Sequence, residues 1–275
     1  MGTYLITGAT GGIGAAVAEL LSGRGHDLIL VARSPDRLDR LASSLRTGSH
    51  AATQVIMTTP DGPAAVPGTG SVAGTGGAGG AGGAVAGAGG TAVRASIRTA
   101  PLDLNEPRRL EAALAVDGLP ERLDGVVHAA GMVRLSPVAE LEADEWIDHL
   151  NVNLVSAAEL TRLLLPSLRL AKGHVVFVNS TAGLRANPEW AAYAASKFGL
   201  RALADSLRAE EPELRVTTVY PGRTATEMQQ RVRAQEGQPY AADDFAAPAT
   251  VARVLVAAIE TPRDAVVSDV TVRPA

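Results

Sequence analysis

A tyrosine and a lysine spaced four residues apart, Tyr193 and Lys197 in the segment YAASK, are the residues in this sequence best suited to moving a proton. On a helix this spacing puts both side chains on one face. A nearby cation favours the phenolate and lowers the pKa of a tyrosine from its ordinary value of about 10. The pair therefore predicts an acid/base tyrosine, although two solvated side chains on a helix surface would have the same spacing.

The lysine is informative because the chain otherwise prefers arginine. Lys172 and Lys197 are the two lysines among 25 basic residues. An ammonium group is compact and its pKa is adjustable, so lysine suits this role better than arginine.

Ser180 ends the apolar run HVVFVNS, thirteen residues before Tyr193. Parallel α/β folds place their chemistry at the carboxyl ends of strands. A loop of this length can bring the serine hydroxyl close to Tyr193, where it could hydrogen-bond a substrate oxygen. A helix cap or an ordinary turn is the alternative role for this serine.

Near the N-terminus, the apolar residues 3–7 run into the glycine-rich turn TGATGGIG (7–14), and a helical pattern follows at once. Glycines allow a tight turn and a close approach of the backbone to a pyrophosphate, which then meets the free N–H groups of the helix. The position between a strand and a helix favours a dinucleotide site over an ordinary turn.

The second strand-like run, LILVA, is followed by Arg33 and Ser34. An acidic residue here would bind a ribose 2′-hydroxyl, whereas arginine matches a 2′-phosphate. The sequence therefore predicts NADP(H) rather than NAD(H) as the cofactor, and a surface arginine is the alternative.

These residues require a scaffold in which strands and helices alternate. Strand-like runs lie at 3–7, 28–32, 93–99, 125–129, 174–179 and 216–220, and helical stretches at 13–23, 36–45, 107–115, 142–170, 191–211 and 249–259. The alternation predicts a single α/β domain over 1–275, a Rossmann-type doubly wound parallel sheet of about seven strands with helices on both faces.

Residues 61–92 interrupt this pattern with 13 of the chain's 29 glycines and 9 alanines. Such a segment loses much backbone entropy on folding and has few side chains to offset the loss. We expect a flexible insertion between the second helix and the third strand. A phosphate cradle is the alternative, but the fixed glycine spacing and the flanking strand and helix are missing.

Composition narrows the classes of function. The net charge of −4 without a long basic run gives no nucleic-acid or membrane footprint. The absence of cysteine excludes disulfides and thiolate chemistry, and the five histidines show no metal-ligand spacing. No signal peptide and no run of about 18 apolar residues is found, so a cytoplasmic protein is expected.

Taken in order along the chain, the motifs resemble those of the classical short-chain dehydrogenase/reductase (SDR) family. The resemblance covers the whole chain outside 61–92, with TGATGGIG (7–14), Asp103-Leu104, HAAG (128–131), Asn153, Ser180, YAASK (193–197) and Pro221-Gly222 with Thr226. By this resemblance the chain would interconvert a carbonyl and a secondary alcohol by hydride transfer.

The resemblance also implies individual roles. Asn153, Ser180, Tyr193 and Lys197 would form the catalytic tetrad: Tyr193 as acid/base, Ser180 orienting the substrate oxygen, Lys197 lowering the tyrosine pKa and binding ribose hydroxyls, and Asn153 holding a water in the proton relay. The expected cofactor-binding residues are Gly8, Thr10, Gly12, Ile13, Gly14, Arg33, Ser34, Asp103, Leu104, Ala129, Ala130, Gly131, Tyr193, Lys197, Pro221, Gly222, Thr224 and Thr226.

Within that set, Asp103 would meet the adenine, Ala129 to Gly131 would line the adenosine side, and Thr224 and Thr226 would contact the carboxamide. From the residues alone, Asn153 could instead be a polar surface residue and Asp103 a helix cap.

Two positions depart from the family's usual pattern. His128-Ala129-Ala130-Gly131 stands where the family usually has Asn-Asn-Ala-Gly. Gly11 stands where many NADP-dependent members carry a basic residue, so the NADP prediction rests mainly on Arg33.

The polar segment 223–248 lies where a substrate lid would lie, with Met228, Tyr240 and Phe245 as apolar candidates to touch substrate. A surface helix and loop is the alternative. Small residues around Tyr193 would permit close helix packing, and the family implies a homodimer or homotetramer.

Two other functions remain open at this point. A non-catalytic NADP(H)-sensing protein would be expected to lose the tyrosine or the lysine, and both are kept. An extended-type SDR acting on a nucleotide sugar fits the glycine spacing of the loop, but only about 50 residues follow Pro221-Gly222, too few for a separate substrate domain.

Overall fold

A computed structural model of the chain describes residues 1–48 and 95–275, which form a three-layer α/β sandwich. The central sheet has seven strands, β1 (Thr3–Thr7), β2 (Asp27–Ala32), β3 (Ile97–Pro101), β4 (Gly125–His128), β5 (His174–Val178), β6 (Arg215–Pro221) and β7 (Asp269–Val272). All neighbours pair in parallel, in the order β3-β2-β1-β4-β5-β6-β7. The predicted doubly wound parallel sheet is confirmed.

Side chains alternate between the two faces of the sheet, and both faces are apolar. Ile6 of β1 and Leu30 of β2 pack into one core, and their neighbours Leu5 and Val31 pack into the other. Strands with both faces covered are mostly apolar, which explains the apolar runs in the sequence, although β6 also buries Thr217 and Thr218.

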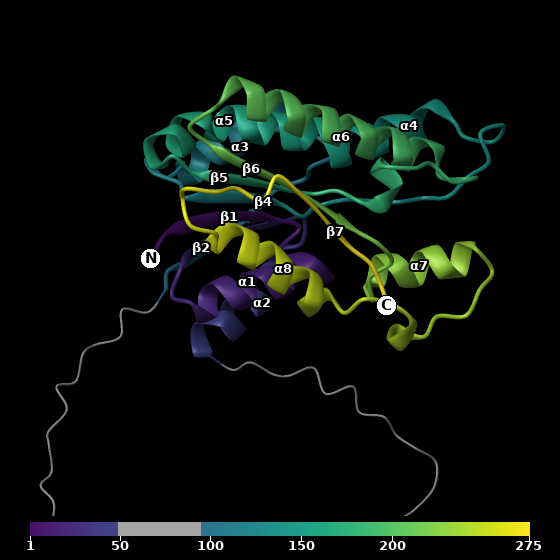
Figure 1. Cartoon of the computed structure of the whole chain (residues 1–275), viewed down its shortest axis with the longest axis horizontal. Helices are drawn as coiled ribbons and strands as arrows, with labels where there is room; N and C mark the ends of the chain where they lie inside the picture. The colour runs from purple at the N-terminus through teal and green to yellow at the C-terminus, as the bar shows by residue number, and fades with distance from the viewer. Residues whose placement is uncertain (49–94) are drawn as a thin grey trace, which may run out of the picture. The chain divides into compact units, whose positions relative to one another are not determined.

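Helices cover each face, as Figure 1 shows. The core on one side is closed by α1 (Gly12–Gly23), α2 (Pro35–Thr47) and α8 (Pro248–Glu260). On the other side lie α3 (Leu110–Asp117), α5 (Ser156–Ala171) and α6 (Ala191–Glu210), with α4 (Ala143–Leu150) packed against α6.

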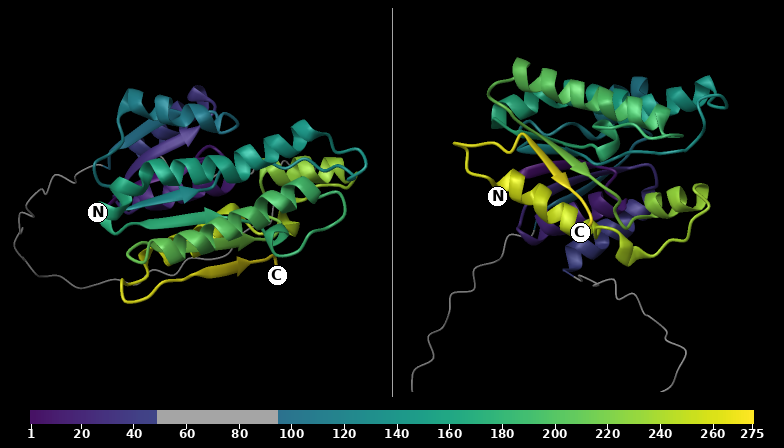
Figure 2. Two further views of the ribbon diagram at one scale, coloured as in Figure 1. Left: turned by 90° about the horizontal axis from the view of Figure 1, so that it is seen from above. Right: turned by 45° about the vertical axis from the view of Figure 1, so that its right-hand side comes forward.

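The strand order reverses between β1 and β4, since β2 and β3 extend one way and β5 to β7 the other. Ligands of doubly wound sheets bind outside the carboxyl ends of the strands at such a point. The short helix α7 (Glu227–Gln235) lies beyond this edge, as both views in Figure 2 show.

The structure differs from the sequence predictions at several boundaries. The stretch predicted as one helix over 142–170 consists of α4, a π-helical turn at Asn151–Val155 and α5. The third strand begins at Ile97 rather than at 93. The seventh strand, Asp269–Val272, escaped prediction because its exposed residues break the apolar run. The predicted insertion at 61–92 lies outside the described residues.

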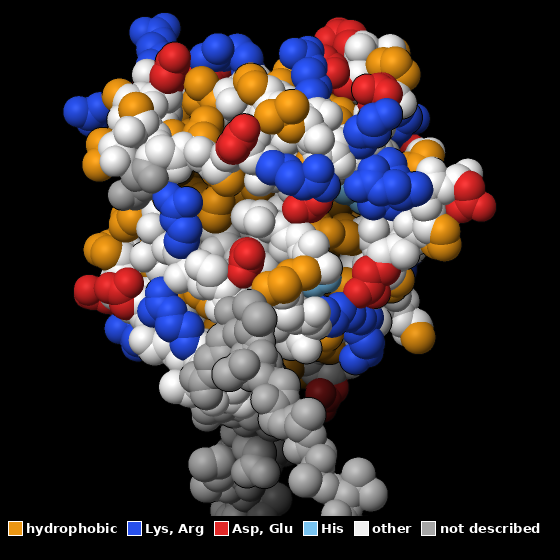
Figure 3. Space-filling model, turned by 90° about the vertical axis from the view of Figure 1, so that its left-hand side faces the viewer, with side chains coloured by type: hydrophobic (Ala, Val, Ile, Leu, Met, Phe, Trp, Pro, Cys, Tyr) orange, Lys and Arg blue, Asp and Glu red, His pale blue; other side chains and the backbone are white. Residues whose placement is uncertain are grey.

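The surface carries mixed charge. On the face drawn in Figure 3, basic side chains are interspersed with acidic and apolar ones. Within the described ranges, no helix combines the length and apolar character needed to cross a membrane. In the same ranges, no three His, Asp or Glu residues come together as a metal site.

The packing of α5 against one face of the sheet predicts which of its leucines stabilise the fold. Leu160 is fully buried and Leu170 is 64% exposed on the same helix. Leu160→Ala should lower the free energy of unfolding by about 2–5 kcal/mol, because it leaves a cavity under the sheet. The matched change Leu170→Ala should stay within about 0.5 kcal/mol. Urea denaturation followed by circular dichroism measures both, and equal effects would contradict this packing.

Candidate active site

Lys197 and Tyr193 lie on the face of α6 that is buried against the sheet edge. Their exposed fractions are 3% and 6%. The Lys197 ammonium donates to the carbonyl oxygen of Val178, at the end of β5, over 3.0 Å, and it lies 5.8 Å from the centre of the Tyr193 ring. The four-residue spacing thus brings both side chains to the same site, as predicted.

Burial changes the protonation of both groups. It lowers the pKa of Lys197 to about 8. It raises the pKa of Tyr193, and a hydrogen bond with Ser180 opposes that shift. At neutral pH the lysine is therefore largely an ammonium and the tyrosine a neutral phenol. The lowering of the tyrosine pKa by Lys197 stays a prediction.

Ser180 follows β5 and has two contacts that suit different roles. Its hydroxyl accepts a hydrogen bond from the Ala182 amide at 3.1 Å, which caps the short 3₁₀ turn Thr181–Gly183. The same side chain opposes the rise in the pKa of Tyr193 and so lies beside the phenol. Ser180 therefore caps a turn and lies at the candidate site at the same time, although the sequence suggested these two roles as alternatives.

Asn179, which sequence reasoning missed, ties Ser180 to the tyrosine helix. Its Oδ1 accepts from the Ser180 amide at 2.8 Å, and its Nδ2 donates to the Lys197 carbonyl at 3.0 Å. Its position directly before Ser180 at a strand end was the available signal. The amide side chain fixes β5 and α6 relative to one another at the point where the two candidate residues meet.

Asn153 lies in the π-helical turn between α4 and α5 and is 2% exposed. Its Oδ1 accepts from the Met132 amide at 2.8 Å, and its Nδ2 donates to the Met132 carbonyl at 3.0 Å and to Ser196 Oγ at 2.9 Å. Ser196 Oγ in turn donates to the Tyr193 carbonyl at 2.7 Å. Asn153 therefore braces the loop after β4 against α6.

The loop after β4 has further side-chain supports. His149 Nε2 accepts from the Arg134 amide at 3.0 Å, and its Nδ1 faces the Glu145 carbonyl at 2.6 Å, which makes Nδ1 the protonated nitrogen. Gln235, at the end of α7, accepts from the Leu135 amide at 2.8 Å. These residues were missed because each acts on a backbone group far away in the sequence.

A cavity of about 170 Å³ opens among these groups. Residues of the predicted site that line it are Ile13, Ala129, Ala130, Gly131, Ser180, Tyr193, Lys197, Pro221, Gly222, Thr224 and Thr226, together with Met228, which was predicted to touch substrate. Lining residues that the sequence reasoning missed include Asn187, Trp190 and Gln229. Trp190 packs edge-on against the Tyr193 ring at 5.6 Å.

The glycine-rich loop has the features that a dinucleotide pyrophosphate needs. Gly8 has φ = 63°, and a side chain there would press against the Ala130 backbone at 2.7 Å. A side chain on Gly12 would meet Thr226 at 2.6 Å. The N-terminus of α1 has no side-chain cap and no acidic residue in its first turn, so its N–H groups suit an anion. The loop therefore fits the group predicted for it.

The remaining predicted cofactor residues lie outside the cavity lining. Arg33 is exposed after β2, and Ser34 caps α2 by accepting from the Arg37 amide at 3.3 Å. Asp103 Oδ1 accepts from the Asn105 amide at 3.0 Å and so closes a turn rather than capping a helix. Leu104 is 6% exposed and belongs to the core.

His128, which departs from the family pattern, is buried away from the cavity. Its ring stacks on Phe177 at 5.1 Å and its Nε2 lies 3.0 Å from Thr161 Oγ1. Burial lowers its pKa to about 3, so it is neutral.

Comparisons with known proteins identify the family of the chain. Residues 3–62 and 75–237 match the short chain dehydrogenase family, and the chain belongs to that family. An uncharacterized oxidoreductase of Listeria innocua is 26% identical over 98% of this chain and 95% of its own length.

Solved structures share the fold. An alcohol dehydrogenase of the archaeon Thermococcus sibiricus, complexed with 5-hydroxy-NADP, has a TM-score of 0.75 at 22% identity and covers 100% of this chain and 97% of its own. A short-chain dehydrogenase of Sphingobium yanoikuyae in complex with NADPH has a TM-score of 0.71 at 23% identity, covering 98% and 87%.

The support of the loop after β4 can be tested at His149. Because His149→Ala removes the acceptor for the Arg134 amide, it should lower the free energy of unfolding by about 1–3 kcal/mol. Amide hydrogen exchange over 132–135, followed by mass spectrometry, should also accelerate about tenfold.

The matched control is His26, whose Nδ1 accepts from the Gly2 amide at 3.1 Å near the N-terminus. His26→Ala should leave exchange over 132–135 unchanged. Unaltered exchange in His149→Ala would show that this imidazole does not hold the loop.

Proposed function

We propose that the chain is an NADP(H)-dependent oxidoreductase that interconverts a carbonyl and a secondary alcohol, with Tyr193 as the acid/base. The observation that carries this proposal is the meeting of Ser180, Tyr193 and Lys197 in one cavity, which continues to the glycine-rich loop through Ile13. The family membership supports the same class of reaction.

In the direction of reduction, the cavity must deliver a proton as a hydride reaches the carbonyl carbon. Bound NADPH would supply the hydride. The hydroxyl of Tyr193, neutral because burial raises its pKa, would give its proton to the substrate oxygen. Ser180 would donate a hydrogen bond to that oxygen and hold it against the phenol. The C=O becomes CH–OH, and the phenolate regains its proton from water.

Lys197 would stabilise the phenolate, because its ammonium is close to the tyrosine and largely charged at neutral pH. Lys197 would also bind the ribose hydroxyls of the cofactor. Asn153 would hold the water of the proton relay through its Oδ1, which accepts one hydrogen bond from the Met132 amide and can accept a second, whereas both Nδ2 protons are already donated.

NADP(H) is the proposed cofactor because Arg33 follows β2, where a ribose 2′-substituent lies in this fold. Among the described residues, Arg33 has no hydrogen bond or ion pair of its own, so its charge is available. Two of the structural relatives were solved with NADPH or an NADP derivative, and a 3-oxoacyl-[acyl-carrier protein] reductase of Brucella melitensis was solved with NAD.

The substrate would enter beneath the segment 223–248, which we propose as a lid. Met228 lines the cavity, whereas Tyr240 and Phe245 stack on each other at 5.5 Å. Phe245 borders a neighbouring open groove that shares Thr181 and Arg223 with the cavity. An apolar substrate part would lie along these residues.

A homodimer or homotetramer is proposed as the assembly. Three large apolar side chains on the helical layer of α4 to α6 are between 41% and 51% exposed: Ile147, Val155 and Phe198. A subunit interface would remove this apolar area from water. The cytoplasmic location and the single domain over 1–275 also remain proposals.

Tyr193→Phe tests the proposed chemistry. Removing the hydroxyl should reduce NADPH turnover by about 10²–10⁴-fold across a panel of ketones and aldehydes, because the proton donor is lost. Absorbance at the NADPH band gives the rate. Tyr4→Phe, near the opposite end of β1, should keep wild-type rates. If Tyr193→Phe and wild type turn over at the same rate, the assignment of Tyr193 is wrong.

Arg33→Ala tests the cofactor preference. A charge-assisted contact to phosphate predicts that NADPH binding weakens about 10–100-fold, whereas NADH binding changes little. Calorimetric titration with both dinucleotides measures the effect. Arg40, exposed on the helix α2 that follows Arg33, supplies the control Arg40→Ala, for which neither affinity should change. Equal losses for NADPH and NADH in Arg33→Ala would remove the basis for NADP(H).

A further inference from the structure

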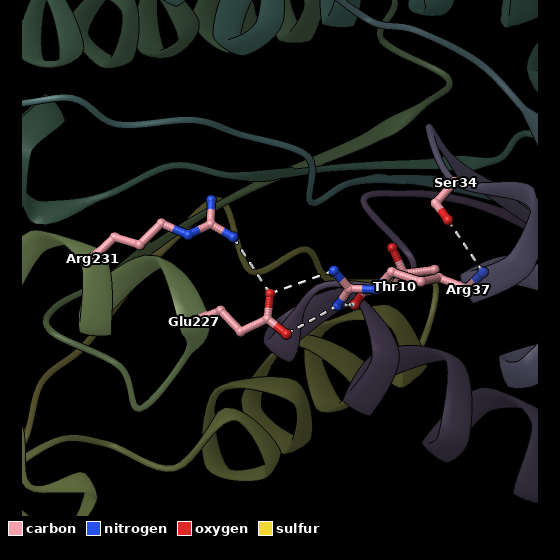
Figure 4. A network of polar contacts seen from close by, with 5 residues as sticks. All are labelled: Thr10, Ser34, Arg37, Glu227 and Arg231. Atoms are coloured by element: carbon pink, nitrogen blue, oxygen red, sulfur yellow. Dashed lines mark hydrogen bonds and ion pairs between the residues drawn. The ribbon is translucent and has the colours of Figure 1, made fainter.

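An ion-pair network joins α7, the helix of the proposed lid and here called the lid helix, to the glycine-rich loop (Figure 4). The guanidinium of Arg37, in the first turn of α2, donates to the carbonyl oxygen of Thr10 at 3.0 Å. It also meets both oxygens of Glu227, the first residue of α7, at 3.1 and 3.4 Å. Arg231, one turn further along α7, approaches the same carboxylate at 3.5 Å. One carboxylate thus bridges two guanidinium groups.

This network lies where the adenosine ribose of a dinucleotide is expected. Arg37 spans the two segments between which the adenosine ribose of a doubly wound fold lies, the loop after β1 and the start of the helix after β2. Arg33 is exposed four residues earlier. Counting Asp36 in the first turn of α2 together with Glu227, the three guanidinium groups of Arg33, Arg37 and Arg231 still exceed the carboxylates by one positive charge.

A carboxylate held in the fork of a guanidinium has the geometry that a phosphate takes. The Arg37 and Glu227 side chains are 42% and 62% exposed, so their ion pair is weak and reversible. A phosphate dianion carries more charge than a carboxylate and would compete for Arg37.

We propose that Glu227 is an internal competitor for the 2′-phosphate of NADP(H), which takes Arg37 from Glu227 and so frees the start of the lid helix. This inference rests on the proposed binding of NADP(H).

Release of α7 would change the lining of the cavity. Thr226, which caps α7, lies against Gly12 of the loop, and α7 carries Met228 and Gln229 of the cavity lining. Gln229 is 7% exposed, and its Nε2 has no hydrogen-bond partner among the described residues. A shift of α7 would therefore move side chains at the substrate position when the phosphate binds.

The test is the affinity of Glu227→Gln for NADPH and NADH, which differ by the 2′-phosphate. Without the competing carboxylate, NADPH should bind about three- to fivefold more tightly, the upper range for an exposed ion pair, and NADH should bind as in wild type. Calorimetric titration at fixed ionic strength gives both dissociation constants, and thermal unfolding verifies that the variant is folded.

Two further variants sharpen the result. The double variant Arg37→Gln/Glu227→Gln should bind NADPH no more tightly than Arg37→Gln alone, because Glu227 acts through Arg37. Glu260, paired with Arg24 at 2.7 Å at the other ends of α1 and α8, gives the matched control Glu260→Gln, for which neither affinity should change.

Unchanged or weaker NADPH binding in Glu227→Gln, or equal tightening of NADPH and NADH, would overturn the proposal. Its failure is distinct from that of the proposed function. A wild-type chain that reduces carbonyls with NADPH but shows no Glu227→Gln effect refutes only this inference. A chain that shows the effect but no turnover refutes only the catalytic proposal.

Discussion

The buried ammonium of Lys197 is the constraint on which the site depends. A charge removed from water is costly unless it is hydrogen-bonded, and the carbonyl of Val178 at the end of β5 supplies the bond. That bond requires α6 to lie close to the strand end. Asn179 secures the approach through the Lys197 carbonyl, and the small, buried side chains of Ala192 and Ala194 give it room. The phenol of Tyr193 is buried by the same packing.

The sheet explains why the polar groups gather at one edge. Both faces of the strands are covered by helices, so apolar residues make up most of the strand interiors, and the polar side chains of the site follow the carboxyl ends of the strands. Ser180 after β5 and Thr224 after β6 share an edge with the loop after β1. The chemistry is therefore assembled from segments that are distant in sequence but adjacent in the sheet.

Local patterns predicted the elements and the residues that project from them. Apolar runs located six strands, and the four-residue spacing brought Tyr193 and Lys197 together. Asp269–Val272 was missed because an edge strand with exposed residues has little apolar signal. The π-helical turn that presents Asn153 was missed because one extra residue in a turn leaves no mark on a helical pattern. Contacts such as Arg134 with His149 depend on tertiary packing.

The link between α2 and α7 joins residues 190 positions apart, and no sequence period could reveal it. A strong, buried ion pair there would hold α7 permanently, whereas an exposed pair can exchange one anion for another. Because Glu227 begins the helix that carries Met228 and Gln229, the exchange would act on the substrate cavity from the adenosine end of the cofactor. The weakness of the contact is thus the property that would let the phosphate control the position of α7.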